Sequence, residues 1–114
     1  MKATLLFFVF TLITLNCSSQ ISQDHYLIEF TDKNDSPYLI NQPEVFLSPK
    51  ALARRSKFNI SVSEQDFPVN PNYIQEVKDL GVKYVQQSRW LNAIVIKTSD
   101  ESKLAIIAAL PFVK

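Results

Sequence analysis

The sequence contains few of the residues that build most active sites. Its 114 residues include one glycine, one cysteine and one histidine. A single glycine excludes a glycine-rich phosphate loop and the nucleophile turn of many hydrolases. The lone histidine, His25, has no second histidine or cysteine at metal-ligand spacing, and its place at a strand start is typical of an exposed residue. The sequence therefore predicts no cofactor, no metal site and no enzymatic activity for this chain.

An excess of charge of either sign is also lacking. There are 12 basic and 11 acidic residues, and removal of Lys2 with a leader would leave the two signs equal. A neutral domain lacks the electrostatic surface expected of a nucleic-acid-binding protein or of one attracted to an anionic membrane. The composition, 46% apolar and 20% charged, is ordinary for one small globular domain. We therefore expect no nucleic-acid partner.

The N-terminus has the pattern of an export signal. Lys2 precedes an uncharged apolar run over residues 3–15, too short for the roughly 20 residues that span a bilayer. Cleavage after Ser19 or Gln20 would leave small residues at the two recognised positions. The sequence therefore predicts a signal peptide over residues 1–19 and an exported protein, either secreted, periplasmic or at the cell surface.

Cys17 allows a second interpretation, as the lipidated cysteine of a bacterial lipoprotein. Asn16 and Thr14 occupy positions where such sites favour a small and an aliphatic residue, so the match is poor. Under ordinary secretion the mature chain has no cysteine and no disulfide, and its stability must come from packing. Membrane attachment after removal of the signal would require lipidation of Cys17.

Alternation predicts a first strand over residues 24–31. Tyr26, Ile28 and Phe30 lie on one face of it, and Leu27 is the apolar exception on the other. A turn cluster and a loop punctuated by prolines follow.

Two helices are predicted by the same pattern, a capping residue followed by proline. Ser48 caps the first, a short helix that ends in basic residues. Residues 59–69 read as a polar loop. Asn70 caps the second helix, and Gly81, the only glycine, follows its apolar stripe. Glycine takes the left-handed conformation at little cost, so Gly81 is predicted to be the helix stop.

A strand pair and a last helix complete the pattern. The strands cover residues 82–88 and 91–97 and are joined by a bend. Thr98 and Glu101 have the spacing of a capping box, and the helix that they open runs through Leu110. Leu104, Ile107, Ala108 and Pro111 are expected along its inner side.

The order strand, helix, strand, strand, helix, strand predicts an α+β fold. It is the ferredoxin-like split βαβ arrangement (βαββαβ), an antiparallel sheet with helices on one face. The last strand begins at Pro111 and looks truncated at Lys114. We expect a fragment, in which residues 20–69 lead into a core over residues 70–114.

Strand 91–97 is apolar on both faces. Leu91, Ala93 and Val95 face one side, and Ile94 and Ile96 face the other. This pattern fits a central strand with a few exposed aliphatic residues. It also fits an open face that docks onto another protein. The residues leave both interpretations open.

Four stretches stand in a fairly specific order: Phe46-Leu47-Ser48 with Ala51-Leu52-Ala53-Arg54-Arg55, Leu80-Gly81-Val82-Lys83, Ser88-Arg89-Trp90-Leu91-Asn92-Ala93, and Leu110-Pro111-Phe112-Val113. Together they resemble the N-terminal propeptide domain of secreted bacterial subtilisin-like serine proteases, especially those of Bacteroidetes. Such a domain has the ferredoxin-like fold, acts as an intramolecular chaperone and temporarily inhibits the protease.

The resemblance implies a docking face and a partner. The open face of the sheet would bind the protease domain, which is expected in cis downstream of Lys114. The side chains offered to it would include Trp90, Asn92, Ile94 and Ile96. The sequence has none of the family's catalytic Asp, His or Ser motifs, so the serine endopeptidase activity would belong to the full-length precursor.

Two other classes of function remain open. One is a free-standing secreted protease inhibitor or protein-binding module of the same fold. The other is a small surface lipoprotein anchored through Cys17.

Overall fold

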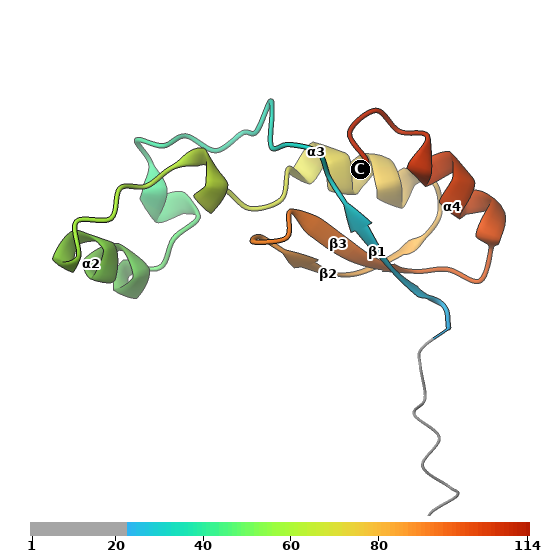
Figure 1. Cartoon of the computed structure of the whole chain (residues 1–114), viewed down its shortest axis with the longest axis horizontal. Helices are drawn as coiled ribbons and strands as arrows, with labels where there is room; N and C mark the ends of the chain where they lie inside the picture. Colours follow the sequence, from blue (N-terminus) through green and yellow to red (C-terminus); the bar gives the residue numbers. More distant parts are fainter. Residues whose placement is uncertain (1–22) are drawn as a thin grey trace, which may run out of the picture.

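A computed structural model describes residues 23–114. The predicted signal peptide and Cys17 lie outside these described residues. Within them, three α-helices and a three-stranded antiparallel sheet form an α+β fold (Figure 1). The predicted α+β class is thereby confirmed.

The sheet has the strand order β1-β3-β2. Strand β3 (Ala93–Lys97) lies in the centre, between β1 (His25–Glu29) and β2 (Lys83–Ser88), and pairs antiparallel with both. Ile28 pairs with Ile94 across β1 and β3. A bulge shifts the register between β2 and β3 around Val85. The three strands are shorter than the alternation predicts, because turns occupy their ends.

Helices α3 (Pro71–Asp79) and α4 (Glu101–Ala108) cover one face of this sheet (Figure 1). The Asn70 side chain caps α3, as predicted, and accepts a hydrogen bond from the backbone N–H of Asn72. The cap of α4 is Asp100 rather than Thr98, because its carboxylate accepts from the Ser102 backbone N–H at 3.0 Å. The Thr98 hydroxyl instead accepts from the Asp100 backbone N–H.

Gly81 follows the end of α3 with a φ of +80°. Its N–H donates to the Lys78 carbonyl at 2.9 Å, and its own carbonyl accepts from Lys103 Nζ at 2.9 Å. A side chain would strain this left-handed backbone. The glycine thus turns the chain from α3 into β2.

One hydrophobic cluster lies between the sheet and its two helices. Nine buried residues form it: Ile28, Phe30, Val69, Val77, Val82, Ile94, Ile96, Ile107 and Phe112. The inner side of α4 differs from the prediction. Ile107 is buried and Leu104 packs against the cluster, but Ala108 and Pro111 are exposed, and α4 ends at Ala108 rather than at Leu110.

Residues 38–67 form a second region, here called the helical lobe, on the side of the sheet toward which the β2–β3 turn points (Figure 1). It contains α2 (Pro49–Lys57) and the 3-10 turns η1 (Pro43–Val45) and η2 (Glu64–Asp66). The Ser48 side chain caps α2 as predicted. Three buried residues form its core: Phe46, Leu47 and Phe67. The polar loop expected over residues 59–69 is only partly confirmed. Phe67 and Val69 in it are buried, and residues Glu64–Asp66 form the 3-10 turn η2.

The end of the chain lies along the free edge of β1. Phe30 and Val113 form a single antiparallel bridge. The Lys114 N–H donates to the Glu29 carbonyl at 2.9 Å, and the Thr31 N–H donates to the Phe112 carbonyl at 2.9 Å. Of the predicted last strand, the described residues therefore show a single bridge at Val113 and no longer strand.

Candidate docking surface

The face of the sheet opposite α3 and α4 is here called the open face. Strand register defines its side chains, because the alternate residues of each strand point into the core. Leu27 and Gln86 both pair with Val95, which gives one row across the three strands. By register the remaining positions of this face are His25, Glu29, Lys83, Ser88, Lys97 and Ala93, of which Ala93 has no exposed surface. In the described chain no helix lies on this side of the sheet (Figure 1).

Apolar side chains occupy the middle of the open face. Leu27 is 51% exposed, Val85 in the bulge of β2 is 42% exposed, and Val95 between them is half-buried. Antiparallel sheets with a solvated face normally place polar residues there. Clustered apolar side chains on such a face indicate a surface that another protein covers.

Charged groups border this apolar strip. Asp24 contacts Lys97, with 3.2 Å between Oδ2 and Nζ, and also contacts His25. The hydrogen bond from Lys97 is the main reason that the pKa of Asp24 lies below its ordinary value. At the other end, Glu29 lies 3.6 Å from the Lys114 ammonium group. An apolar centre with a polar rim is the usual anatomy of a protein–protein interface.

Two of the residues that the sequence placed on the docking face need correction. Ile94 and Ile96 have no exposed surface and belong to the core under the helices. They pair with Ile28 and Tyr26, whose side chains share that face. The side chains of β3 that point away from the helices are therefore those that alternate in step with Val95.

Asn92 also has an internal role. It takes a φ of +49° in the turn before β3, and its Nδ2 donates to the carbonyls of Phe30 and Asp32 at 3.1 and 2.8 Å. These bonds tie the turn to the end of β1. Of the four residues proposed for docking, only Trp90 presents a large exposed surface, at 78%.

The sequence contained a signal for which face of the sheet is open. Leu27 interrupts the polar face of the first strand, and Val95 has the same parity once β1 and β3 are paired. The sequence pattern does not predict which face of the sheet Val85 occupies. The bulge changes the alternation of side chains along β2, and nothing in the sequence pattern marks the bulge.

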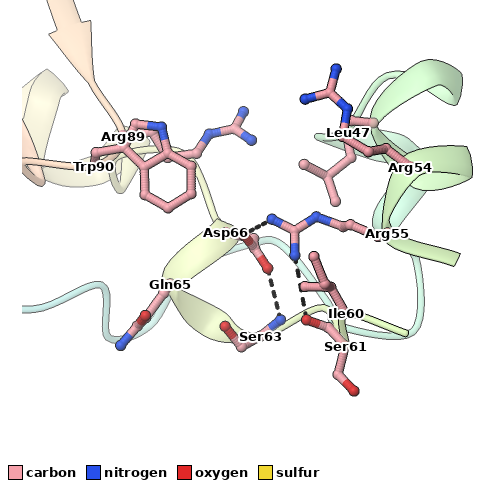
Figure 2. Close-up of a pocket in the computed structure, with 11 residues that line it drawn as sticks. Leu47, Arg54, Arg55, Ile60, Ser61, Ser63, Gln65, Asp66, Arg89 and Trp90 are labelled. Carbon is pink, nitrogen blue, oxygen red and sulfur yellow. Dashed lines mark hydrogen bonds and ion pairs between the residues drawn. The ribbon is translucent and has the colours of Figure 1, made fainter. Parts of the chain in front are cut away.

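A cleft of about 670 Å³ lies between the helical lobe and the β2–β3 turn (Figure 2). Helix α2 contributes Arg54 and Arg55, and the turn contributes Arg89 and Trp90. Arg55 forms an ion pair with the buried Asp66. The Asp66 carboxylate also accepts the Ser63 backbone N–H at 3.0 Å, so this pair stabilises η2.

Lys33 joins the lobe to the sheet region. Its Nζ donates to the carbonyls of Gln65, Phe67 and Arg89 at 2.8, 2.7 and 3.1 Å. Burial, followed by the charge of Arg89, lowers the pKa of Lys33, and the charge of Asp66 partly opposes this shift. Arg89 Nη2 in turn donates to the Phe46 carbonyl at 3.0 Å. Lys33 thus binds backbone of the lobe and of the β2–β3 turn, and Arg89 binds the turn to the lobe.

Two further features are absent from residues 23–114. No group of three or more histidine, cysteine, aspartate or glutamate residues there could hold a metal ion. No helix in that part of the chain is long and apolar enough to cross a membrane.

Comparison with protein-family models gives a match over residues 25–114. The matching model is the peptidase S8 propeptide domain of Bacteroidota. The chain belongs to this family. The match includes the helical lobe as well as the sheet, so both regions are parts of one propeptide domain. No curated protein and no solved structure matches the chain.

Membership of the family has direct consequences for function. A propeptide domain is not catalytic, and this family is linked to S8 peptidases, the subtilisin-like serine proteases. Membership of this family implies that the partner is a protease domain in cis. The propeptide then lies in the N-terminal region of a protease precursor. S8 proteases with such propeptides are usually secreted.

Proposed function

We propose that this propeptide domain assists the folding of the S8 protease domain of its own precursor and then inhibits it until removed. Binding would occur through the open face of the sheet. The observation that carries this proposal is the exposed apolar strip of Leu27, Val85 and Val95, on the side of the sheet that α3 and α4 leave uncovered.

The folding role follows from a preformed surface. The sheet is ordered by its own core, so little conformational entropy is lost when the protease covers it. Burial of a half-exposed leucine contributes about 1 kcal/mol, and several such side chains together stabilise the native protease surface relative to the unfolded chain. A propeptide bound in this way lowers the barrier to folding if the surface already forms in the transition state.

The inhibitory role needs a segment that reaches the protease active site. We infer that the precursor continues along the free edge of β1 after Lys114, which would give the ferredoxin-like strand order expected from the sequence. The Lys114–Glu29 hydrogen bond supports this direction. The segment beyond would occupy the substrate cleft. Export through the predicted signal peptide over residues 1–19 is part of the same proposal.

Refolding of the protease domain with the chain added in trans tests the proposal. Leu27→Glu places a charge on the open face, and Ile106→Glu is its matched control on α4, since the two side chains are 51% and 52% exposed. We expect Leu27→Glu to reduce the recovered peptidase activity at least about tenfold, because the charge would be desolvated in the complex. Ile106→Glu should leave recovery unchanged.

Inhibition of the mature protease gives a second readout with the same variants. Both substitutions are at exposed positions, so circular dichroism and thermal unfolding should show both proteins folded. Equal behaviour of the two variants would exclude the open face as the docking surface. A wild-type chain that neither assists folding nor inhibits would overturn the proposed function.

A further inference from the structure

The cleft between the helical lobe and the β2–β3 turn gathers positive charge on a chain that is otherwise balanced. Residues 46–63 contain four basic residues and no acidic one; the basic residues are Lys50, Arg54, Arg55 and Lys57. Arg54 and Arg55 line the cleft, and Arg89 enters it from the opposite wall. One carboxylate in the lining, that of Asp66, offsets only the charge of Arg55.

The two remaining guanidinium groups have free donors. The Arg54 side chain is exposed, and no hydrogen bond or ion pair of this side chain is found within the described part of the chain. Arg89 donates one hydrogen bond, to the Phe46 carbonyl, out of the five N–H groups of an arginine. Figure 2 shows both side chains extending into the same opening from opposite walls. Such a pair fits a carboxylate, which arginine binds through two parallel hydrogen bonds.

An apolar wall accompanies this charge. Trp90 stands beside Arg89 and is 78% exposed, and Ile60 across the cleft is 51% exposed. Tryptophan and arginine are the residues most enriched among those that dominate binding energy at interfaces. The cleft thus combines carboxylate recognition with an apolar contact, which together fit a segment of polypeptide.

We propose that this cleft receives an acidic segment of the protease domain, with Arg54 and Arg89 binding its carboxylates and Trp90 covering its apolar side chains. The proposal rests on the proposed function. Charge complementarity supports this occupant, and so does continuity with the open face. Ser88 belongs to that face and directly precedes the turn that carries Arg89 and Trp90. A protease lying on the sheet can therefore extend over the turn.

Inhibition of the mature protease by the whole chain tests the role of Arg54. Arg54→Gln removes a charge that has no ion-pair partner within residues 23–114, and Lys50→Gln removes the same charge from the same helix outside the cleft. We expect Arg54→Gln to weaken inhibition about threefold to tenfold and to reduce its dependence on salt. Lys50→Gln should change it less than about twofold. Equal effects of the two substitutions would overturn the inference while leaving the open face as the docking surface.

Fluorescence of Trp90 tests the cleft without the protease. Trp90 is the only tryptophan, so its emission reports on this site alone. The probes are a short peptide of alternating glutamate and leucine, its glutamine counterpart, and inorganic phosphate. A saturable change with the glutamate peptide that is weaker in Arg54→Gln supports the inference. No change, or an equal response to the glutamine peptide or to phosphate, overturns it. This result stands even if the chain proves not to inhibit the protease.

Discussion

The sheet region and the helical lobe are stabilised in different ways. The sheet region buries nine side chains in one cluster between β1, β3 and their two helices. The lobe buries three side chains, with Tyr38, Ala51, Leu52 and Val62 partly buried around them. Its remaining support comes from charged side chains that bind backbone and each other, above all Lys33, Arg89 and the Arg55–Asp66 pair. Polar contacts thus supplement the small core of the lobe.

This difference has a consequence for dynamics. Apolar burial in the sheet region is cooperative because every member of the cluster contacts several others. The lobe depends on a few hydrogen bonds, each of which contributes about 1 to 3 kcal/mol when a charged group takes part. We therefore expect the lobe to open locally before the sheet unfolds. Such an order would let the lobe adjust to a partner while the sheet stays rigid.

Ile94→Ala should have the largest effect. Its side chain has no exposed surface in the middle of the central strand. Loss of the buried methyl groups and the cavity left behind should lower the free energy of unfolding by about 4 kcal/mol. Denaturant unfolding followed by circular dichroism measures this value. A loss below about 1 kcal/mol would contradict the role of the sheet cluster.

Phe67→Ala makes the matching change in the lobe. Phe67 is 6% exposed and contacts Phe46 edge-on, with 5.2 Å between ring centroids. We expect a loss of about 3 kcal/mol, confined to the lobe, because the sheet has its own core. Hydrogen exchange should increase over residues 38–67 and stay unchanged in β3. Equal acceleration in both regions would show that they unfold as one unit.

Lys33→Met tests the joint between the two regions. The substitution keeps the length of the side chain and leaves three backbone carbonyls without their donor. A loss of about 2 kcal/mol is expected, together with faster hydrogen exchange in η2. Lys83→Met on the exposed edge strand is the control and should cost little. Unchanged exchange in η2 would mean that Lys33 does not hold the lobe.

Gly81→Ala tests a turn that belongs to the sheet region alone. The new methyl group would sit at a φ of +80° and 3.0 Å from Lys103 Nζ. The lysine can move, so the left-handed backbone sets the cost, about 1 kcal/mol. Thermal unfolding would measure it, and the lobe should exchange as in the wild type. A stabilised variant would show that the turn is not left-handed in solution.

The smallest effect is expected from Tyr73→Phe, and it depends on pH. Tyr73 donates to Asp32 at 2.7 Å, which lowers the pKa of Asp32 and raises the pKa of Tyr73 to about 12. The hydrogen bond contributes fully to stability when the pH lies between the ordinary pKa of an aspartate and the ordinary pKa of a tyrosine. It is lost as pH falls through the lowered pKa of Asp32, and it fades as pH rises from 10 to about 12.

At neutral pH the difference between wild type and Tyr73→Phe should be roughly 0.5 kcal/mol, because the pair is partly exposed to solvent. Unfolding measured across the pH range should show this difference vanish at both extremes. A difference that does not change with pH would exclude the hydrogen bond as its source.

The local elements could be predicted from the sequence because their signals are local. Ser48 and Asn70 cap helices at the positions predicted, and Gly81 lies where α3 must end. Tyr26 and Ile28 mark the buried face of β1. The errors lie where two signals compete, as at α4, where Asp100 caps the helix although Thr98 has the expected spacing.

The sequence by itself determined the α+β class, the caps of α2 and α3 and the resemblance to a propeptide, since each depends on residues close together in the chain. Only the tertiary structure decided which face of β3 is open, because parity depends on pairing with β1 and on the bulge in β2. It also decided that Arg54 and Arg89, 35 positions apart, line one cleft. Contacts between distant segments depend on how the whole chain packs, which no local pattern records.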